Sequence, residues 1–73
     1  MNKFIEYKLL SSITGGLNEV YDTFDEVKER FMYIMNHKEE FKSNSMIFAY
    51  MNVYNEEGKI VQYKTLGTID LNK

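Results

Sequence analysis

The sequence contains no cysteine, and this absence excludes several classes of site. Disulfide bonds, zinc sites with thiolate ligands and catalysis by a thiol all require that side chain. A chain without it is suited to a reducing compartment.

Long apolar runs are also missing. No stretch of the chain approaches the roughly 20 apolar residues that a membrane-spanning helix needs. Met1 leads within three residues into the charged, alternating run Lys3–Lys8, so we expect no signal peptide. These two features predict a cytoplasmic protein.

The chain has little net charge. Eleven acidic and nine basic residues give a formal net charge of −2, which offers no electrostatic reason to expect a nucleic acid or an anionic membrane as partner. One locally acidic stretch could imitate a phosphate backbone toward a basic protein, although helix capping and solvation account for it more simply. Its carboxylates are Glu19, Asp22, Asp25, Glu26 and Glu29.

No set of residues in the sequence indicates a reaction. His37 and Glu40 have the spacing of neighbours on a helix, but two ligands are too few for a metal site. The serines have no identifiable base, and the Gly15–Gly16 pair is followed by neither a lysine nor a helix start, so it does not match a phosphate-binding loop. We therefore predict a protein that is not an enzyme, with no catalytic, metal-binding or cofactor-binding residues, no cofactor and no small-molecule ligand.

What is present describes a small folded domain. The chain has 73 residues, of which 44% are hydrophobic and 27% charged, and these are ordinary values for a globular protein. Residues 1–73 are expected to form a single domain near the lower size limit for a core without disulfides or metal. Association with a partner or with a second copy is thus a plausible source of stability.

The clearest structural signal is a hairpin between Ser45 and Gly67. Two runs of β-favouring residues flank Asn55–Gly58, where Asn55 suits the start of a type I turn and Gly58 suits a left-handed position. If Asn55 opposes Lys59, the simple register pairs Tyr54 with Ile60, Val53 with Val61, Met51 with Tyr63, and Phe48 with Leu66.

This register gives the hairpin two different faces. The first is compact and apolar, suited to lie beneath a helix, and it carries Ile47, Ala49, Met51, Val53, Val61, Tyr63 and Thr65. The second is aromatic and polar, and it carries Met46, Phe48, Tyr50, Asn52, Tyr54, Ile60, Gln62, Lys64 and Leu66.

The first half of the chain predicts a second hairpin and then a helix. Phe4–Leu10 alternates as a strand, residues 11–16 have turn chemistry, and Leu17–Tyr21 is a short strand. Thr23 and Glu26 match a capping box, in which Glu26 reaches back to the Thr23 amide. An apolar stripe of about four turns follows, formed by Phe24, Val27, Phe31, Ile34, Met35 and Phe41.

The predicted fold is therefore α+β, with the order ββαββ. One helix packs on a four-stranded, mainly antiparallel sheet in two layers, and the strand order stays open. The tail from Thr68 to Lys73 extends the last strand through Ile69 and Leu71.

The aromatic face is the candidate site. Tyrosine and amide side chains are typical of protein recognition surfaces, although tyrosine also favours half-exposed strands for purely structural reasons. The predicted partner-binding residues are Phe48, Tyr50, Asn52, Tyr54, Ile60, Gln62, Lys64 and Leu66.

Two classes of partner compete for this face. A protein or a second copy of the chain could cover it, or single-stranded nucleic acid could stack its bases on the rings. The missing basic channel favours a protein. Compact, cysteine-free chains of this size are common among phage and mobile-element accessory proteins that act as inhibitors or regulators, and we expect a function of that kind.

Overall fold

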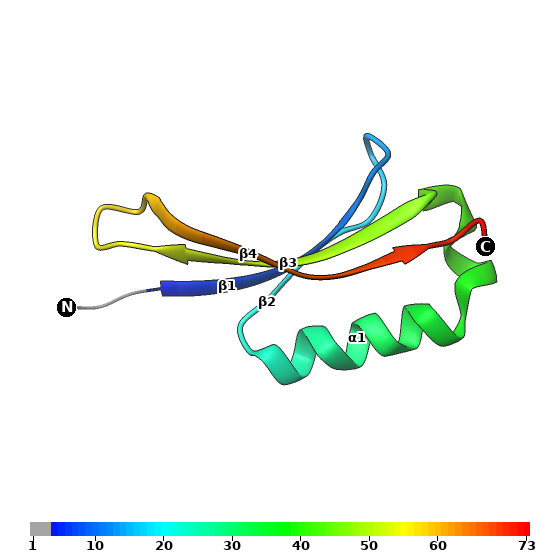
Figure 1. The fold of residues 1–73 in the computed structure, drawn as a ribbon, viewed down its shortest axis with the longest axis horizontal. Coiled ribbons are helices and arrows are strands. Elements are labelled where there is room, and N and C mark those ends of the chain that lie inside the picture. Colours follow the sequence, from blue (N-terminus) through cyan, green and yellow to red (C-terminus); the bar gives the residue numbers. More distant parts are fainter. Residues whose placement is uncertain (1–3) are drawn as a thin grey trace.

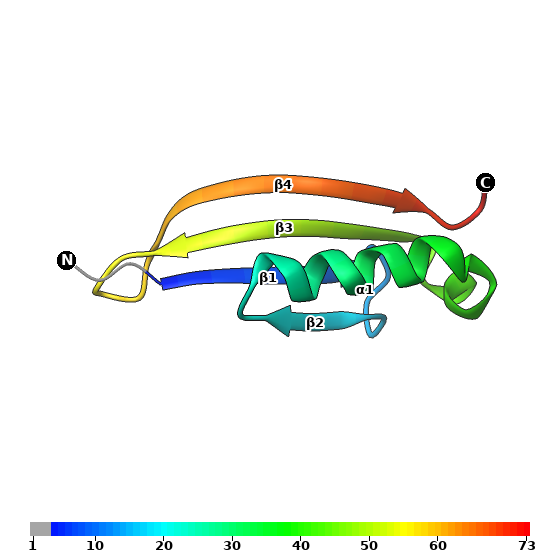
Figure 2. The ribbon, with the colours of Figure 1, turned by 90° about the horizontal axis from the view of Figure 1, so that it is seen from below.

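A computed structural model describes residues 4–73 of the chain. The described elements follow one another as β1 (Phe4–Ser11), β2 (Asn18–Tyr21), α1 (Phe24–Asn36), the 3-10 helix η1 (Lys38–Asn44), β3 (Met46–Tyr54) and β4 (Ile60–Asp70). All neighbouring strands are antiparallel, in the order β2-β1-β3-β4. The helix α1 packs on one face of this sheet (Figures 1 and 2), so the predicted two-layer α+β fold is confirmed.

The helix begins where the sequence predicts. The Thr23 Oγ1 atom accepts a 3.2 Å hydrogen bond from the Glu26 backbone amide, as expected for an N-cap. The reciprocal contact differs from the predicted capping box, because the Glu26 carboxylate accepts from the Thr23 hydroxyl at 2.9 Å. The α-helix ends at Asn36 and not near Phe41, since Asn36 and His37 are weak helix formers. Phe41 therefore reaches the core from η1.

The core lies between α1 and the adjoining part of the sheet. Its buried members are Leu9, Val27, Ile34, Ile47, Ala49, Ile69 and Leu71, with Tyr7, Leu17, Tyr21, Phe31, Phe41 and Leu66 packed around them. The predicted helical stripe is only partly buried, because Phe24 and Met35 keep 48% and 43% of their surface exposed. The helix therefore covers less of its apolar stripe than the residue spacing indicated.

The turn of the β3–β4 hairpin matches the prediction. The Asn55 amide donates to the Lys59 carbonyl at 2.9 Å, and Gly58 has a φ of +80°. The Asn55 side-chain oxygen also accepts from the Glu57 and Lys59 amides, at 2.9 and 3.0 Å. The first pair of the ladder, Tyr54 with Ile60, is confirmed.

The remaining register of this hairpin differs from the prediction because β4 contains two bulges. One falls at Val61 and the other at Leu66, and each leaves that residue without a partner in the ladder. The predicted pairs of Val53 with Val61, Met51 with Tyr63 and Phe48 with Leu66 are therefore wrong. In the structure Val53 pairs with Gln62, Met51 with Lys64, and Phe48 with Thr68.

The first bulge exchanges the two faces of β4. Tyr63 and Thr65 pair with Asn52 and Tyr50 and so share the face turned away from α1, opposite to the prediction. Gln62 and Lys64 pair with Val53 and Met51, on the side of the sheet that carries the core. Leu66, which was predicted to lie on the aromatic face, packs against the core.

One end of the sheet projects past the helix, and we call it the arm. It consists of Phe4–Glu6, Asn52–Tyr54 and Ile60–Tyr63, which lie side by side in the sheet. Figure 1 shows it extending on the left, beyond the first turn of α1, and the principal extents of the molecule are 43, 24 and 16 Å. Within residues 4–73, this part of the sheet therefore has no helix on either side.

Candidate binding surface

The face of the sheet turned away from α1, which we call the outer face, has no element packed on it among residues 4–73 (Figure 1). Three strands provide most of it. The register places on it Phe4, Glu6, Lys8 and Leu10 from β1, Met46, Phe48, Tyr50, Asn52 and Tyr54 from β3, and Ile60, Tyr63, Thr65, Thr68 and Asp70 from β4.

The structure brings five of the eight predicted site residues together here. These are Phe48, Tyr50, Asn52, Tyr54 and Ile60. The other three, Gln62, Lys64 and Leu66, are removed from the outer face by the bulges, and we correct the predicted site accordingly. The prediction missed Tyr63 for the same reason. It also missed Leu10, because the pairing of β1 with β3 could not be derived from the sequence.

A shallow depression forms the centre of the outer face. Its volume is about 360 Å³, and it is lined by Leu10, Phe48, Tyr50, Asn52, Ile60 and Tyr63. The Tyr50 and Tyr63 rings lie 5.5 Å apart, tilted by 44°. Asn52 is only 5% exposed although no helix covers it, so the neighbouring side chains shield it from water. The depression thus combines aromatic walls with one sheltered amide.

A second aromatic pair lies at the arm end of the outer face. The Tyr54 hydroxyl donates a 2.8 Å hydrogen bond to Glu6 Oε1, and the Phe4 ring lies 5.7 Å from the Tyr54 ring. The hydrogen bond to Glu6 raises the pKa of Tyr54 above its usual value. These contacts hold the Tyr54 ring in one orientation before any partner binds.

The charges on the outer face nearly balance. Lys8 is its only basic side chain among the described residues, and Glu6 and Asp70 are acidic. Lys64, which was predicted to lie on this face, pairs with Met51 and lies on the opposite side of the sheet. The described part of the chain therefore places no basic channel beside the rings.

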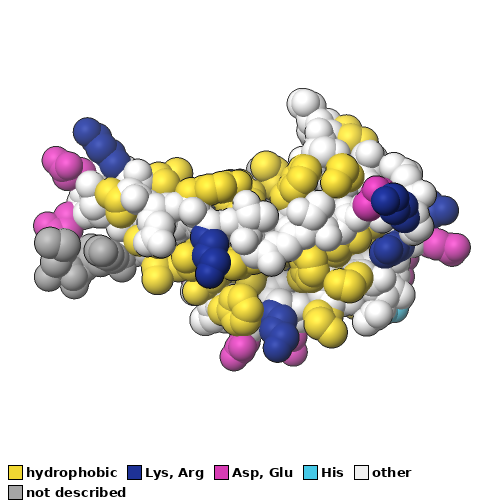
Figure 3. Space-filling model, viewed as in Figure 1, with side chains coloured by type: hydrophobic (Ala, Val, Ile, Leu, Met, Phe, Trp, Pro, Cys, Tyr) yellow, Lys and Arg dark blue, Asp and Glu magenta, His cyan; other side chains and the backbone are white. Residues whose placement is uncertain are grey.

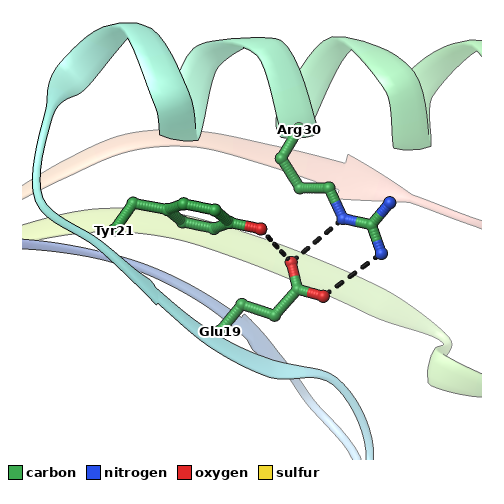
Figure 4. A network of polar contacts seen from close by, with 3 residues as sticks. All are labelled: Glu19, Tyr21 and Arg30. Atoms are coloured by element: carbon green, nitrogen blue, oxygen red, sulfur yellow. Dashed lines mark hydrogen bonds and ion pairs between the residues drawn. The ribbon is translucent and has the colours of Figure 1, made fainter.

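On the other side of the sheet, a polar network joins β2 to α1 (Figure 4). Arg30 binds the Glu19 carboxylate with two hydrogen bonds of 3.0 and 3.1 Å, and the Tyr21 hydroxyl donates to the same carboxylate at 2.6 Å. The Arg30 guanidinium also lies 5.4 and 5.2 Å from the centres of the Tyr33 and Phe41 rings. This arrangement is a structural clamp that holds the short strand β2 against the helix.

The clamp changes the acidity of its members. Burial raises the pKa of Glu19, but the hydrogen bonds from Arg30 and Tyr21 and the Arg30 charge outweigh it and leave this pKa below its usual value. Burial, with the hydrogen bond to Glu19, raises the pKa of Tyr21 to about 12. Glu19 is therefore engaged inside the protein, and of the predicted acidic stretch Glu26 is engaged as well, at the helix cap.

The other polar residues noted in the sequence have structural contacts. His37 stacks on the Tyr33 ring at 4.1 Å, and its Nδ1 atom lies 2.8 Å from the Tyr33 carbonyl oxygen. Ser11 and Ser12 bind the Asn44 carbonyl. Within residues 4–73, no three His, Asp or Glu side chains come together as a metal site, and no helix is both long and apolar enough to span a membrane.

Comparisons with known proteins give no relative from which to transfer a function. No protein-family model, curated protein sequence or solved structure matches this chain. The outer face is therefore interpreted from its own residues.

Proposed function

We propose that this chain is a small, cytoplasmic, non-enzymatic module that binds a partner protein through the outer face. The observation that supports this proposal most strongly is the uncovered depression walled by Phe48, Tyr50 and Tyr63. Aromatic rings beside an amide are enriched in protein interfaces, because a ring gives a large contact area at a low cost in conformational entropy. The pre-ordered Tyr54 ring lowers that cost further.

The composition of the face also defines the chemistry of the partner. Its aromatic and aliphatic side chains suit an apolar patch on the partner, and the hydroxyls of Tyr50 and Tyr63 suit hydrogen-bonding groups around that patch. The charged side chains that residues 4–73 place on this face, Lys8, Glu6 and Asp70, do not call for a strongly charged partner. A protein surface with an exposed aliphatic or aromatic anchor fits this description.

A module of this kind acts by occupying its partner's surface. No recognisable set of catalytic residues stands out in the sequence, and a bound module can block or reposition whatever the partner would otherwise contact. Inhibition or regulation, of the kind found in phage and mobile-element accessory proteins, is the corresponding biological role.

Single-stranded nucleic acid is the alternative ligand. Bases could stack on Tyr50, Tyr63 and Phe48, as they do on other aromatic sheet surfaces. Such surfaces normally add several basic side chains that follow the phosphates, whereas among residues 4–73 this face has only Lys8. The charge balance therefore favours a protein.

Capture of partners from the native cell tests the proposal. The double variant Tyr50→Ser, Tyr54→Ser should lose the captured protein, with a loss of at least tenfold in affinity once that protein is purified. Met32→Ser is the control, because Met32 is 49% exposed on α1, away from the outer face. Equal capture by the wild type and the double variant would overturn the proposal, provided that circular dichroism shows both to be folded.

A fluorescent single-stranded oligothymidine tests the alternative. We expect no measurable binding even at low salt, where phosphate contacts are strongest. Binding that weakens with salt and is lost in the Tyr50→Ser, Tyr54→Ser variant would replace the protein partner with nucleic acid.

A further inference from the structure

The outer edge of β4 is a long strand edge with no partner. The sheet ends at β4, and no strand within residues 4–73 pairs with this edge. The strand has 11 residues, and every residue from Ile60 to Thr65 is exposed. Its free amide and carbonyl groups form a template that a further strand can extend.

The two edges of the sheet differ in how they are protected. At the opposite edge, β2 has only four residues and is held by the Glu19–Arg30 clamp. So short an edge strand limits unwanted pairing with other chains. The β4 edge has no proline, and Lys64 is the only charged residue between Ile60 and Thr68. Figure 3 looks onto this edge and shows hydrophobic side chains above and below the strand.

The side chains along this edge provide apolar surface for an interface. Ile60, Val61 and Tyr63 remain 54%, 53% and 61% exposed. A two-fold contact would bury these side chains and the strand edge of both copies, an interface of roughly 1,000 Å² or less, which is the size class of weak, transient contacts.

The bulges restrict where two copies can pair. β4 is regular over Gln62–Thr65 and again over residues 67–70, and only the first of these runs is exposed at every residue, so we place the two-fold axis there. An axis at Lys64 would place two ammonium groups opposite each other, which is unfavourable. An axis at Tyr63 places Lys64 opposite the partner's Gln62 and brings the two Tyr63 side chains together.

We propose that two copies of this chain form a dimer by pairing antiparallel along the outer edges of β4, with Tyr63 at the two-fold axis. In this register Tyr63 of one copy lies opposite Tyr63 of the other, and the two-fold axis is perpendicular to the joined sheet. Both helices therefore lie on the same side of that sheet. The two outer faces then form one surface. The inference does not rest on the proposed function, because the edge can pair whether or not the outer face binds another protein.

The molar mass in solution is the first test. Light scattering across protein concentrations from about 5 to 500 μM should show a rise from the 8.7 kDa of one chain toward twice that value. Val61→Lys should weaken this association by at least tenfold. Val20→Lys is the matched control, because Val20 is 52% exposed on β2, at the opposite edge, and this variant should associate like the wild type.

A cross-link tests the register, and the absence of native cysteine makes it specific. Residues directly opposite in an antiparallel pair have Cα atoms about 4.5 to 5.5 Å apart, which lies within the range for a disulfide. Tyr63→Cys should therefore form a covalent dimer under mild oxidation, and Val20→Cys should not.

The outcomes separate this inference from the proposed function. A mass of one chain at every concentration would overturn the dimer. A dimer that Val61→Lys leaves intact and that Tyr63→Cys does not cross-link would overturn the β4 edge as its interface. Partner capture measures the outer face alone, so either proposal can fail without the other.

Discussion

The Asn44 side-chain oxygen accepts a 2.8 Å hydrogen bond from the Leu17 backbone amide, and this contact joins segments that are 27 positions apart in the sequence. The same side chain donates to the Phe41 carbonyl at 3.1 Å, and the Asn44 backbone carbonyl accepts from the Ser11 hydroxyl at 2.9 Å. One asparagine thus provides hydrogen-bond partners both for the end of η1 and for the loop between β1 and β2. Gly16 leaves the room for this junction, since a Cβ there would lie 2.5 Å from the Ser11 Oγ atom.

Replacement of this asparagine should destabilise the protein. Asn44→Ala leaves the partly buried Leu17 amide without its acceptor, and we expect the free energy of unfolding to fall by about 1 to 3 kcal/mol. Urea denaturation followed by circular dichroism measures this change. Asn36→Ala, at an exposed helical position, is the control and should stay within about 0.5 kcal/mol of the wild type. Equal stability of the two variants would show that the junction contributes nothing.

Two phenylalanines of α1 should differ in their contribution to stability. Phe31 packs against the core, and a Cβ built on Gly67 would lie 3.0 Å from its Cζ atom, so the ring lies directly over that glycine. We expect Phe31→Ala to cost about 3 kcal/mol, which could abolish folding in so small a domain. Phe24→Ala should cost about 1 kcal/mol, because this ring is 48% exposed. The thermal unfolding midpoints of the two variants test the difference, and equal shifts would contradict it.

The clamp predicts an acid-sensitive contribution to stability. Because the pKa of Glu19 is lower in the folded state, its stabilisation is present above the unfolded value of 4.5 and is lost as the pH falls through the folded value. Unfolding free energies measured from pH 6 to pH 3 should fall more steeply for the wild type than for Glu19→Gln. Glu29→Gln, at an exposed position of α1, is the control. A wild-type slope that Glu19→Gln leaves unchanged would contradict this assignment.

Tyr21 should show the complementary behaviour in alkali. Its pKa is raised to about 12, so its stabilising contribution is complete below pH 10 and is lost as the pH rises toward 12. Absorbance of tyrosinate should contain a late component that disappears in Tyr21→Phe and moves to lower pH in Glu19→Gln. If the late component survives in Tyr21→Phe, it belongs to another tyrosine.

The features that the sequence predicted correctly depend on residues close together in the chain. Thr23 with Glu26 starts the helix, and Asn55 with Gly58 closes the hairpin, because each of these devices is complete within four residues. The alternating apolar residues of β3 likewise identified which of its faces carries the core, and Ile47 and Ala49 are buried as expected. Local chemistry therefore specified the elements and most of the packing of β3.

The features that could not be predicted depend on contacts between distant segments. Neither bulge has a glycine at its extra residue, which is Val61 in one and Leu66 in the other. The only local signal is Gly67, which follows Leu66 inside the strand. Leu66 joins the core beside Phe31, and Gly67 gives that ring its room, a relation across more than 30 positions. Strand order also depends on contacts between distant segments, and for this reason the contribution of Leu10 to the candidate surface was missed.

The two bulges of β4 act as a compensating pair. Each reverses the alternation of side chains, so that Ile69 and Leu71, beyond the second bulge, point back into the core. Loss of a single residue from Gln62–Thr65 would turn the aliphatic side chains of Ile69 and Leu71 outward, whereas loss of two adjacent residues would keep them in the core. The number of residues between the bulges must therefore stay even. This requirement comes from Ile69 and Leu71, which follow the segment, and does not depend on which side chains the segment itself carries.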